Sequence, residues 1–349
     1  MNLRYLQLEL METAYLISKE FCKIKPGENV LITGDTENDW RAIEAVAGAS
    51  QAVGGKVAVL WHAALPGFGK VGDPYIPKPV KVAIANTDVW IEFNNQWLLY
   101  STPWDKVMEA GKVRHLCLVG MDTKRLVRMI GKINLPILNK FQNKIAEMLE
   151  TAQKIKVTSP GGTNISFQND PGRPFLMGNG IADKPGVTFP PGNITWSPIE
   201  KTMNGTIVFD GSMALGGPLS LGILKNPIVT EVKNGVIVRV KGGREAKIFE
   251  KWLADFRDPN MYNLAHAEYS CNPGAALSGL GIEDERIWGA FECGIGDQAK
   301  IYGGKSGPAP SHADSESLNT SWWLDDVQLQ DEGKVIHPEL VELAKKLGR

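Results

Sequence analysis

The feature that most constrains the fold is a change of pattern near residue 150 of this 349-residue chain. Before it, short apolar runs that are typical of doubly buried strands alternate with segments that have helical spacing. Strands separated by helices predict βαβ units, and therefore a parallel sheet covered on both faces. The expected helices span about residues 3–24 and 40–53, and the expected strands span 29–34, 56–61, 88–93 and 114–119.

Beyond a long helical segment at about 136–154, the pattern changes to short β-rich pieces separated by glycine and proline. The clearest β-rich pieces are 156–158, 164–166, 206–208 and 236–238, with helices expected at about 245–256 and 338–347. The sequence therefore predicts an α/β protein with two domains. A parallel-sheet βαβ domain would span residues 1–150, and a strand-rich α+β domain would span 151–349.

Composition excludes several classes of partner. The chain has 38 Lys and Arg against 39 Asp and Glu, so its charge gives no reason to expect nucleic acid or an anionic membrane. No apolar run reaches the ~18–20 residues that span a bilayer. The first ten residues mix Arg4, Gln7 and Glu9 into apolar positions, unlike a signal peptide, so a cytoplasmic location is expected.

The first predicted strand is not followed by a nucleotide-binding loop. Residues 34–38 read Gly-Asp-Thr-Glu-Asn and contain neither the dinucleotide fingerprint nor the P-loop pattern. Without those glycines the backbone cannot approach a pyrophosphate closely. We therefore expect no dinucleotide cofactor.

A metal site can draw on only five histidines in this chain. His312 and Asp314 are two residues apart, so in an extended segment their side chains point to the same face. A second imidazole from His266 would give two histidines and one carboxylate, a set that suits non-haem Fe(II). The alternative is that these three are unrelated polar residues.

Several segments of the C-terminal half carry a family resemblance. They are residues 189–198 (FPPGNITWSP), 204–210 (NGTIVFD), 258–266 (DPNMYNLAH), 312–314 (HAD) and 323–326 (WLDD). With this order and spacing, residues 185–326 resemble the thermophilic metalloaminopeptidases of the AmpS group. They resemble still more the 2,5-dihydroxypyridine 5,6-dioxygenases, which are Fe(II) enzymes on the same scaffold.

Departures from the peptidase pattern favour the dioxygenase. At the positions of two glutamate ligands of the peptidases this chain has Asn193 and His266, and a bridging histidine is absent near Trp288 or Gly289. The resemblance thus implies that His266, His312 and Asp314 are the ligands of one Fe(II) per chain.

The resemblance to the dioxygenase is not complete. Tyr100 and Thr188 occupy positions where that family has histidines. Tyr100 can act as an acid, but with an ordinary pKa near ~10 it is a poor base at neutral pH. This favours a related hydroxylated ring as substrate. Glu268 is a further candidate for orienting a ligand or moving a proton.

Three side chains are candidates for contacts with the substrate: hydrogen bonds from Asn193 and Ser311, and ring stacking on Trp196.

The sequence therefore predicts a ring-cleaving dioxygenase that uses one Fe(II) and O₂ on a hydroxylated pyridine or related aromatic, in a homo-oligomer. One alternative is a metalloaminopeptidase that binds Zn or Co through altered ligands such as Glu268, Glu292 or Asp297. Another is a non-catalytic binding protein on the same scaffold. Metal content and O₂ uptake separate the three.

Overall fold

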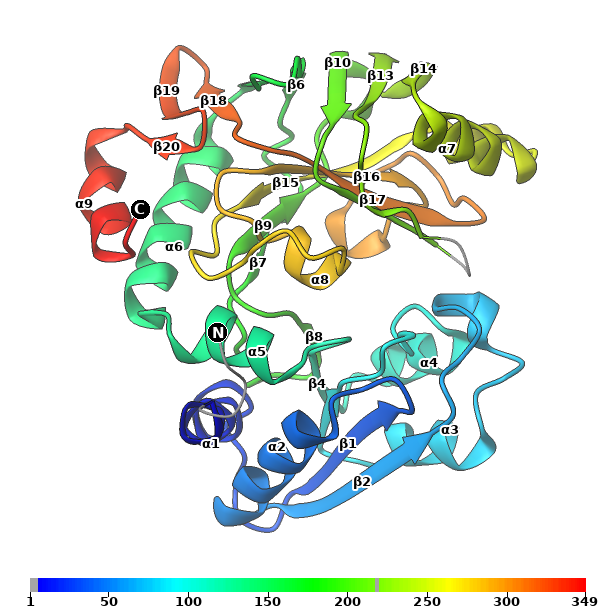
Figure 1. Cartoon of the computed structure of the whole chain (residues 1–349), viewed down its shortest axis with the longest axis vertical. Helices are drawn as coiled ribbons and strands as arrows, with labels where there is room; N and C mark the ends of the chain where they lie inside the picture. Colours follow the sequence, from blue (N-terminus) through cyan, green and yellow to red (C-terminus); the bar gives the residue numbers. More distant parts are fainter. Residues whose placement is uncertain (1–5, 217–219) are drawn as a thin grey trace. The chain divides into compact units, whose positions relative to one another are not determined.

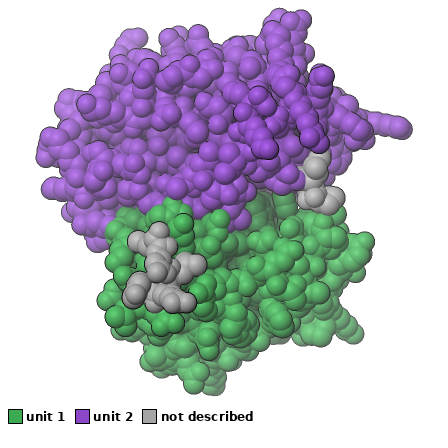
Figure 2. Space-filling model, viewed as in Figure 1, with its two compact units in different colours: residues 1–133, 178–191 green, residues 134–177, 192–349 purple. Residues whose placement is uncertain are grey.

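A computed structural model describes residues 6–216 and 220–349 of the chain. The described residues form two compact units, which Figure 2 shows in different colours. Unit 1 comprises residues 1–133 and 178–191, and unit 2 comprises 134–177 and 192–349. The sequence predicts a single domain boundary, near residue 150. In the structure the long helix before that point belongs to unit 2, and a short segment after it returns to unit 1.

Unit 1 is built on a five-stranded sheet in the order β2-β1-β3-β4-β8, with every registered pair parallel (Figure 1). Its strands are β1 (Asn29–Asp35), β2 (Lys56–His62), β3 (Val89–Glu92), β4 (Arg114–Cys117) and β8 (Gly186–Thr188). The side chains of β3 and β4 are buried throughout, as expected for central strands of a parallel sheet covered by helices.

The helices of unit 1 are α1 (Gln7–Leu16), α2 (Trp40–Ala52), α3 (Lys78–Ala85), α4 (Thr102–Ala110) and α5 (Thr123–Leu126). A π-turn, Ile17–Phe21, extends α1, as the predicted helix at 3–24 requires, although its residues 3–5 lie outside the described residues. On one face of the sheet, Val80 of α3 and Val107 of α4 join Leu31 and Trp90 in a buried cluster. Helical spacing of apolar residues thus produces the cover that the parallel sheet needs.

Unit 2 contains two sheets whose registered pairs are all antiparallel. The eight-stranded sheet has the order β14-β13-β10-β6-β5-β18-β19-β20. Its strands are β5 (Lys154–Thr158), β6 (Asn164–Gln168), β10 (Asn204–Phe209), β13 (Ile228–Lys233), β14 (Val236–Gly242), β18 (Ser321–Leu324), β19 (Val327–Asp331) and β20 (Lys334–Val335).

The seven-stranded sheet has the order β12-β11-β17-β16-β15-β9-β7. Its strands are β7 (Leu176–Gly178), β9 (Asn193–Trp196), β11 (Ser212–Leu215), β12 (Gly222–Ile223), β15 (Leu264–Ser270), β16 (Phe291–Gly296) and β17 (His312–Ser317). Strands β9, β15 and β16 are buried at every position, so both faces of this sheet are covered.

Aromatic side chains fill the space between the two sheets. Trp196 and Tyr269 of the seven-stranded sheet pack on Trp322 of the eight-stranded sheet, with ring centroids 6.3 and 5.1 Å apart. Phe291 likewise lies 5.5 Å from Trp322 and 6.4 Å from Phe167. This packing of sheet on sheet is the core of unit 2.

The α-helices in the described part of unit 2 are α6 (Leu135–Thr151), α7 (Arg244–Asp255), α8 (Gly281–Asp284) and α9 (Pro338–Lys346). No helix in the described part of the chain is long and apolar enough to cross a membrane. The predicted fold class, a parallel-sheet α/β region followed by a strand-rich region, is confirmed.

Candidate metal centre

The seven-stranded sheet brings the predicted ligands together. In its register, His266 of β15 lies opposite Gly294 of β16, and Gly294 lies opposite Asp314 of β17. His312 is two residues before Asp314 on the same strand, so its side chain points to the same face. The three side chains, distant in sequence, therefore share one face of adjacent strands.

The distances agree with a single site. His312 Nε2 lies 2.7 Å from Asp314 Oδ1, and His266 Nε2 lies 3.5 Å from the same oxygen. One ligating atom from each of the three residues lies within 4.8 Å of the others. Atoms bound to one metal at ~2.1 Å are roughly 3–4 Å apart, so a small closure suffices for coordination.

Gly294 makes room for this arrangement. A Cβ atom at this position would overlap the Cε1, Nδ1 and Nε2 atoms of the His266 ring. The imidazole therefore lies over the strand where any other residue would have a side chain. Gly294, on the strand between those of His266 and Asp314, is therefore a part of the site.

The orientation of His312 is set by the backbone. Its Nδ1 lies 2.6 Å from the carbonyl oxygen of Asp297, which can only accept a hydrogen bond. Nδ1 therefore carries the hydrogen, and Nε2 is directed at Asp314. Metal-ligating histidines are commonly held in this way.

The charges of the site favour a bound cation. Burial opposes protonation of His312, but the Asp314 carboxylate and the Asp297 carbonyl outweigh it and raise the pKa of His312 to about 9. Burial raises the pKa of Asp314, but the adjacent imidazoles outweigh it and hold that pKa below its usual range. Burial lowers the pKa of His266 to about 4, so its ring is neutral. A divalent cation would take the place of the proton on His312.

Three carboxylates form a row on the same face, two positions along the strands from His266, Gly294 and Asp314. They are Glu268 of β15, Glu292 of β16 and Glu316 of β17, which are paired in register. Glu292 Oε2 is 3.0 Å from His266 Nε2. Glu268 accepts hydrogen bonds from the side chains of Asn193, at 2.8 Å, and Thr195. Burial raises the pKa of Glu268 to about 7, although Arg286 and these hydrogen bonds oppose the shift.

Two of the predicted substrate contacts lie on or next to this face. Asn193 is buried beside Glu268, and its Oδ1 has no hydrogen-bond partner in the part of the chain that the structure describes. Ser311, half-buried, directly precedes β17, and its carbonyl accepts from Asp297 N at 2.8 Å.

Trp196 does not lie on this face, and Tyr100 belongs to the other unit. Trp196 is paired with Ala267, so it points to the opposite face, where its Nε1 donates to Asn169 at 2.9 Å in the aromatic core. Tyr100 belongs to unit 1, where it has a left-handed φ of 63° and its ring packs on Trp104 at 5.4 Å.

Several contacts of the site escaped the sequence analysis. Tyr302 packs its ring 5.4 Å from His266, and the Asp297 carbonyl orients His312. The sequence suggested Glu292 only as a metal ligand in the alternative metalloaminopeptidase. Its position inside the apolar run Phe291–Cys293 was the one available signal, because a buried carboxylate needs a partner.

A second group of possible ligands, Glu92, His115 and Cys117, lies in unit 1. Trp104 Nε1 donates to His115 Nδ1 at 3.1 Å, and His115 Nε2 lies 3.0 Å from Glu92 Oε2. Glu92 also accepts a hydrogen bond from the Leu98 backbone.

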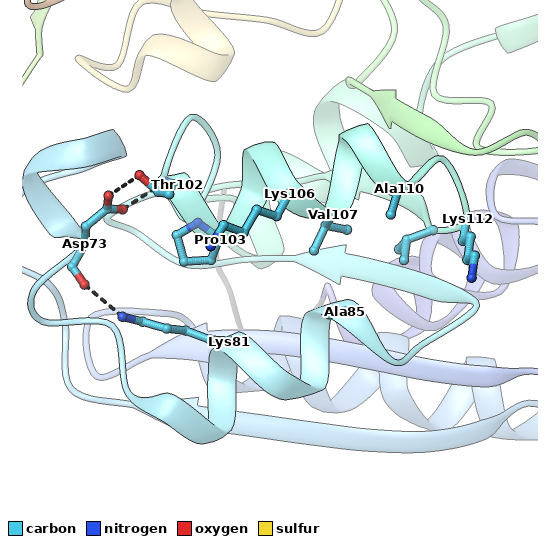
Figure 3. A pocket seen from close by; sticks show the side chains of 10 residues that line it. Asp73, Lys81, Ala85, Thr102, Pro103, Lys106, Val107, Ala110 and Lys112 are labelled. Carbon is cyan, nitrogen blue, oxygen red and sulfur yellow. Dashed lines mark hydrogen bonds between the residues drawn. The ribbon is translucent and has the colours of Figure 1, made fainter.

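The cavity shown in Figure 3 also belongs to unit 1 and contains none of the predicted site residues. It has a volume of about 350 Å³ and is lined by residues of α3 and α4 and of the segments next to them, with Lys81, Lys106 and Lys112 among the lining residues. Lys81 Nζ donates to the Asp73 carbonyl at 3.1 Å, and Asp73 accepts from Thr102.

The chain is similar to known proteins in sequence and in fold. A curated relative, the 2,5-dihydroxypyridine 5,6-dioxygenase of Pseudomonas putida KT2440, is 27% identical over 205 residues, a match that covers 55% of this chain and 57% of the relative. Two solved structures share the fold. That of 2,5-dihydroxypyridine dioxygenase from the same organism has a TM-score of 0.77 at 21% identity, covering 96% of this chain and 99% of that one.

AmpT from Thermus thermophilus has a TM-score of 0.68 at 13% identity, covering 95% of this chain and 99% of that one. The family model described as 2,5-dihydroxypyridine 5,6-dioxygenase (NicX) matches residues 11–337. The chain therefore belongs to the 2,5-dihydroxypyridine 5,6-dioxygenase family.

Proposed function

We propose that this chain is a ring-cleaving dioxygenase that uses one Fe(II) per chain and O₂ to open a hydroxylated pyridine or a related aromatic ring. The observation that carries the proposal is the convergence of His266, His312 and Asp314 in a member of this family. Two imidazoles and one carboxylate leave adjacent coordination positions open, which is the arrangement that suits non-haem iron.

The residues present fit such an ion. Gly294 admits the His266 ring, and Asp297 fixes the tautomer of His312 so that Nε2 is available. When bound, Fe(II) supplies a path for electrons between the electron-rich ring and O₂. The reaction breaks one ring C–C bond and places both oxygen atoms in the product, so no other reductant is needed.

The remaining roles follow from position. Asn193 and Ser311 are proposed to hydrogen-bond the substrate, and Glu268 to move a proton or to hold Asn193 in place. Tyr100 is proposed as an acid, because its phenol donates a hydrogen bond at neutral pH. Trp196 is not proposed to stack on the substrate, because it is 1% exposed and lies in the core.

The test is an anaerobic metal analysis followed by O₂ uptake with a panel of hydroxypyridines and other hydroxyaromatics. We expect one Fe(II) per chain and uptake of one O₂ per ring opened. His266→Ala should lose the iron and the turnover while keeping the circular dichroism of the native fold. Two Zn or Co ions per chain with hydrolysis of an amide substrate would overturn the proposal, and so would full iron content in His266→Ala.

A further inference from the structure

Glu292 is placed to control the geometry of His266. It is fully buried, and its Oε2 lies 3.0 Å from His266 Nε2. Among the residues that the structure describes, Glu292 is the hydrogen-bond partner of this ring, because His266 Nδ1 has none.

The two carboxylates beside Glu292 in the row are held by other groups. Glu268 accepts from Asn193 and Thr195, and Glu316 accepts from the backbone and hydroxyl of Ser212, both at 2.9 Å. Glu292 differs from both, because its hydrogen bond is to a ring nitrogen of His266, at 3.0 Å. The row therefore contains one carboxylate directed at a predicted ligand and two that are not.

The ring of His266 needs such a partner. Gly294 leaves the strand beneath it without a side chain, so no neighbour on β16 at that position fixes the rotation of the ring. The other contacts are the rings of His312 and Tyr302, at centroid distances of 5.2 and 5.4 Å, which pack without specifying a hydrogen-bonding direction. With its hydrogen on Nε2, the ring donates to Glu292, which supplies that direction and leaves Nδ1, which has no other partner in the described part of the chain, as the nitrogen that would bind a metal.

Glu292 is not itself one of the converging ligands. The group of atoms that lie within 4.8 Å of one another contains His266, His312 and Asp314 alone. We therefore infer that Glu292 is a positioning residue, which sets the ring orientation of His266 and thereby the affinity and geometry of the metal centre. This inference rests on the proposed function, since it requires a metal at the triad.

The test uses Co(II) as the probe, because its visible spectrum reports ligand geometry without turnover. Glu292→Met removes the acceptor at similar size, and Glu292→Gln keeps an oxygen acceptor without the charge. Glu316→Met is the matched control, because it removes an equally buried carboxylate from the next strand of the same row.

We expect Glu292→Met to weaken Co(II) binding by roughly 10- to 100-fold and to shift the visible bands. Glu292→Gln should recover part of the affinity, and it keeps the test valid if the methionine variant does not fold. Glu316→Met should bind Co(II) with the affinity and spectrum of the wild type, even if its unfolding temperature falls.

Wild-type affinity and spectrum in both Glu292 variants would overturn the inference and leave the proposed function standing. Equal losses in Glu292→Met and Glu316→Met would overturn it too, because the effect would then be general to the row. A wild-type protein that binds neither Co(II) nor Fe(II) would overturn the proposed function, and the inference with it.

Discussion

At the scale of single residues, the imidazole of His266 lies over Gly294, at the position where any other residue would have its Cβ atom. The site is therefore sensitive to a substitution of Gly294 that adds a single methyl group and no charge. All three predicted ligands would still be present, but His266 would have to move.

We expect Gly294→Ala to displace the His266 ring, to lower the free energy of unfolding by about 1–3 kcal/mol and to weaken metal binding. Chemical denaturation and Co(II) titration measure the two effects. The control is Gly48→Ala, in helix α2, where the new methyl group would meet no atom within 4 Å. That variant should gain roughly 0.5–1 kcal/mol in stability, because alanine favours a helix. Wild-type metal affinity in Gly294→Ala would contradict the steric argument.

At the scale of secondary-structure elements, helix α2 begins with a charged cap. The Asp39 carboxylate accepts from Arg41 N at 3.3 Å and from the backbone and hydroxyl of Thr123 at 3.1 and 2.7 Å. Burial opposes its charge, but the hydrogen bonds from Arg41 and Thr123 outweigh it and lower the pKa of Asp39 from 3.8 to about 2. The cap thus also ties α2 to the start of α5.

A folded-state pKa below that of the unfolded chain means that ionised Asp39 stabilises the fold at neutral pH. This stabilisation is lost as the pH falls from about 4 to about 2. Asp39→Asn should therefore be less stable than the wild type by about 1 kcal/mol near pH 6, a figure reduced for solvent screening. The gap should close on acidification, as urea unfolding at a series of pH values would show. A gap that stayed constant down to pH 2 would argue against the charged cap.

The helices and strands could be predicted from the sequence more reliably than the pairing of the strands with one another. Strands β1 to β4 and helix α2 follow from apolar runs and helical spacing, which are local properties. The meeting of His266 with Asp314 depends instead on pairing across β16, and on a register shift between Leu264 and His266 that makes Ala265 an extra residue in β15. No local pattern encodes that register.

The expectation for Trp196 has a different origin. Strand β9 reads Asn-Ile-Thr-Trp, so polar and apolar residues alternate along it, and residues three positions apart point to opposite faces. This local pattern already separates Trp196 from Asn193, and the expected ring stacking at the site did not follow from it. The triad itself was predictable because metal ligands are restricted to a few residue types.

At the scale of the whole molecule, all three predicted ligands belong to unit 2, on strands β15 and β17. Binding of a metal to the folded state alone should stabilise that state by ~4 kcal/mol at a free concentration 1,000 times Kd. We expect hydrogen–deuterium exchange to slow on metal loading in β15, β16 and β17, with the amides of β1 to β4 in unit 1 unchanged.

A chelator should reverse this protection, and His312→Ala, which lacks a ligand, should show none. Equal slowing of exchange in both units, or slowing confined to unit 1, would place the metal elsewhere.

The seven-stranded sheet turns its aromatic side chains to one face and its histidines and carboxylates to the other. Packing and the proposed chemistry thereby occupy opposite surfaces of the same strands. Because alternate positions along a strand point in opposite directions, a catalytic group can be exchanged without disturbing the packing behind it. Such a scaffold can keep its core while the sequence diverges, and two structures that share it with this chain are only 21% and 13% identical to it.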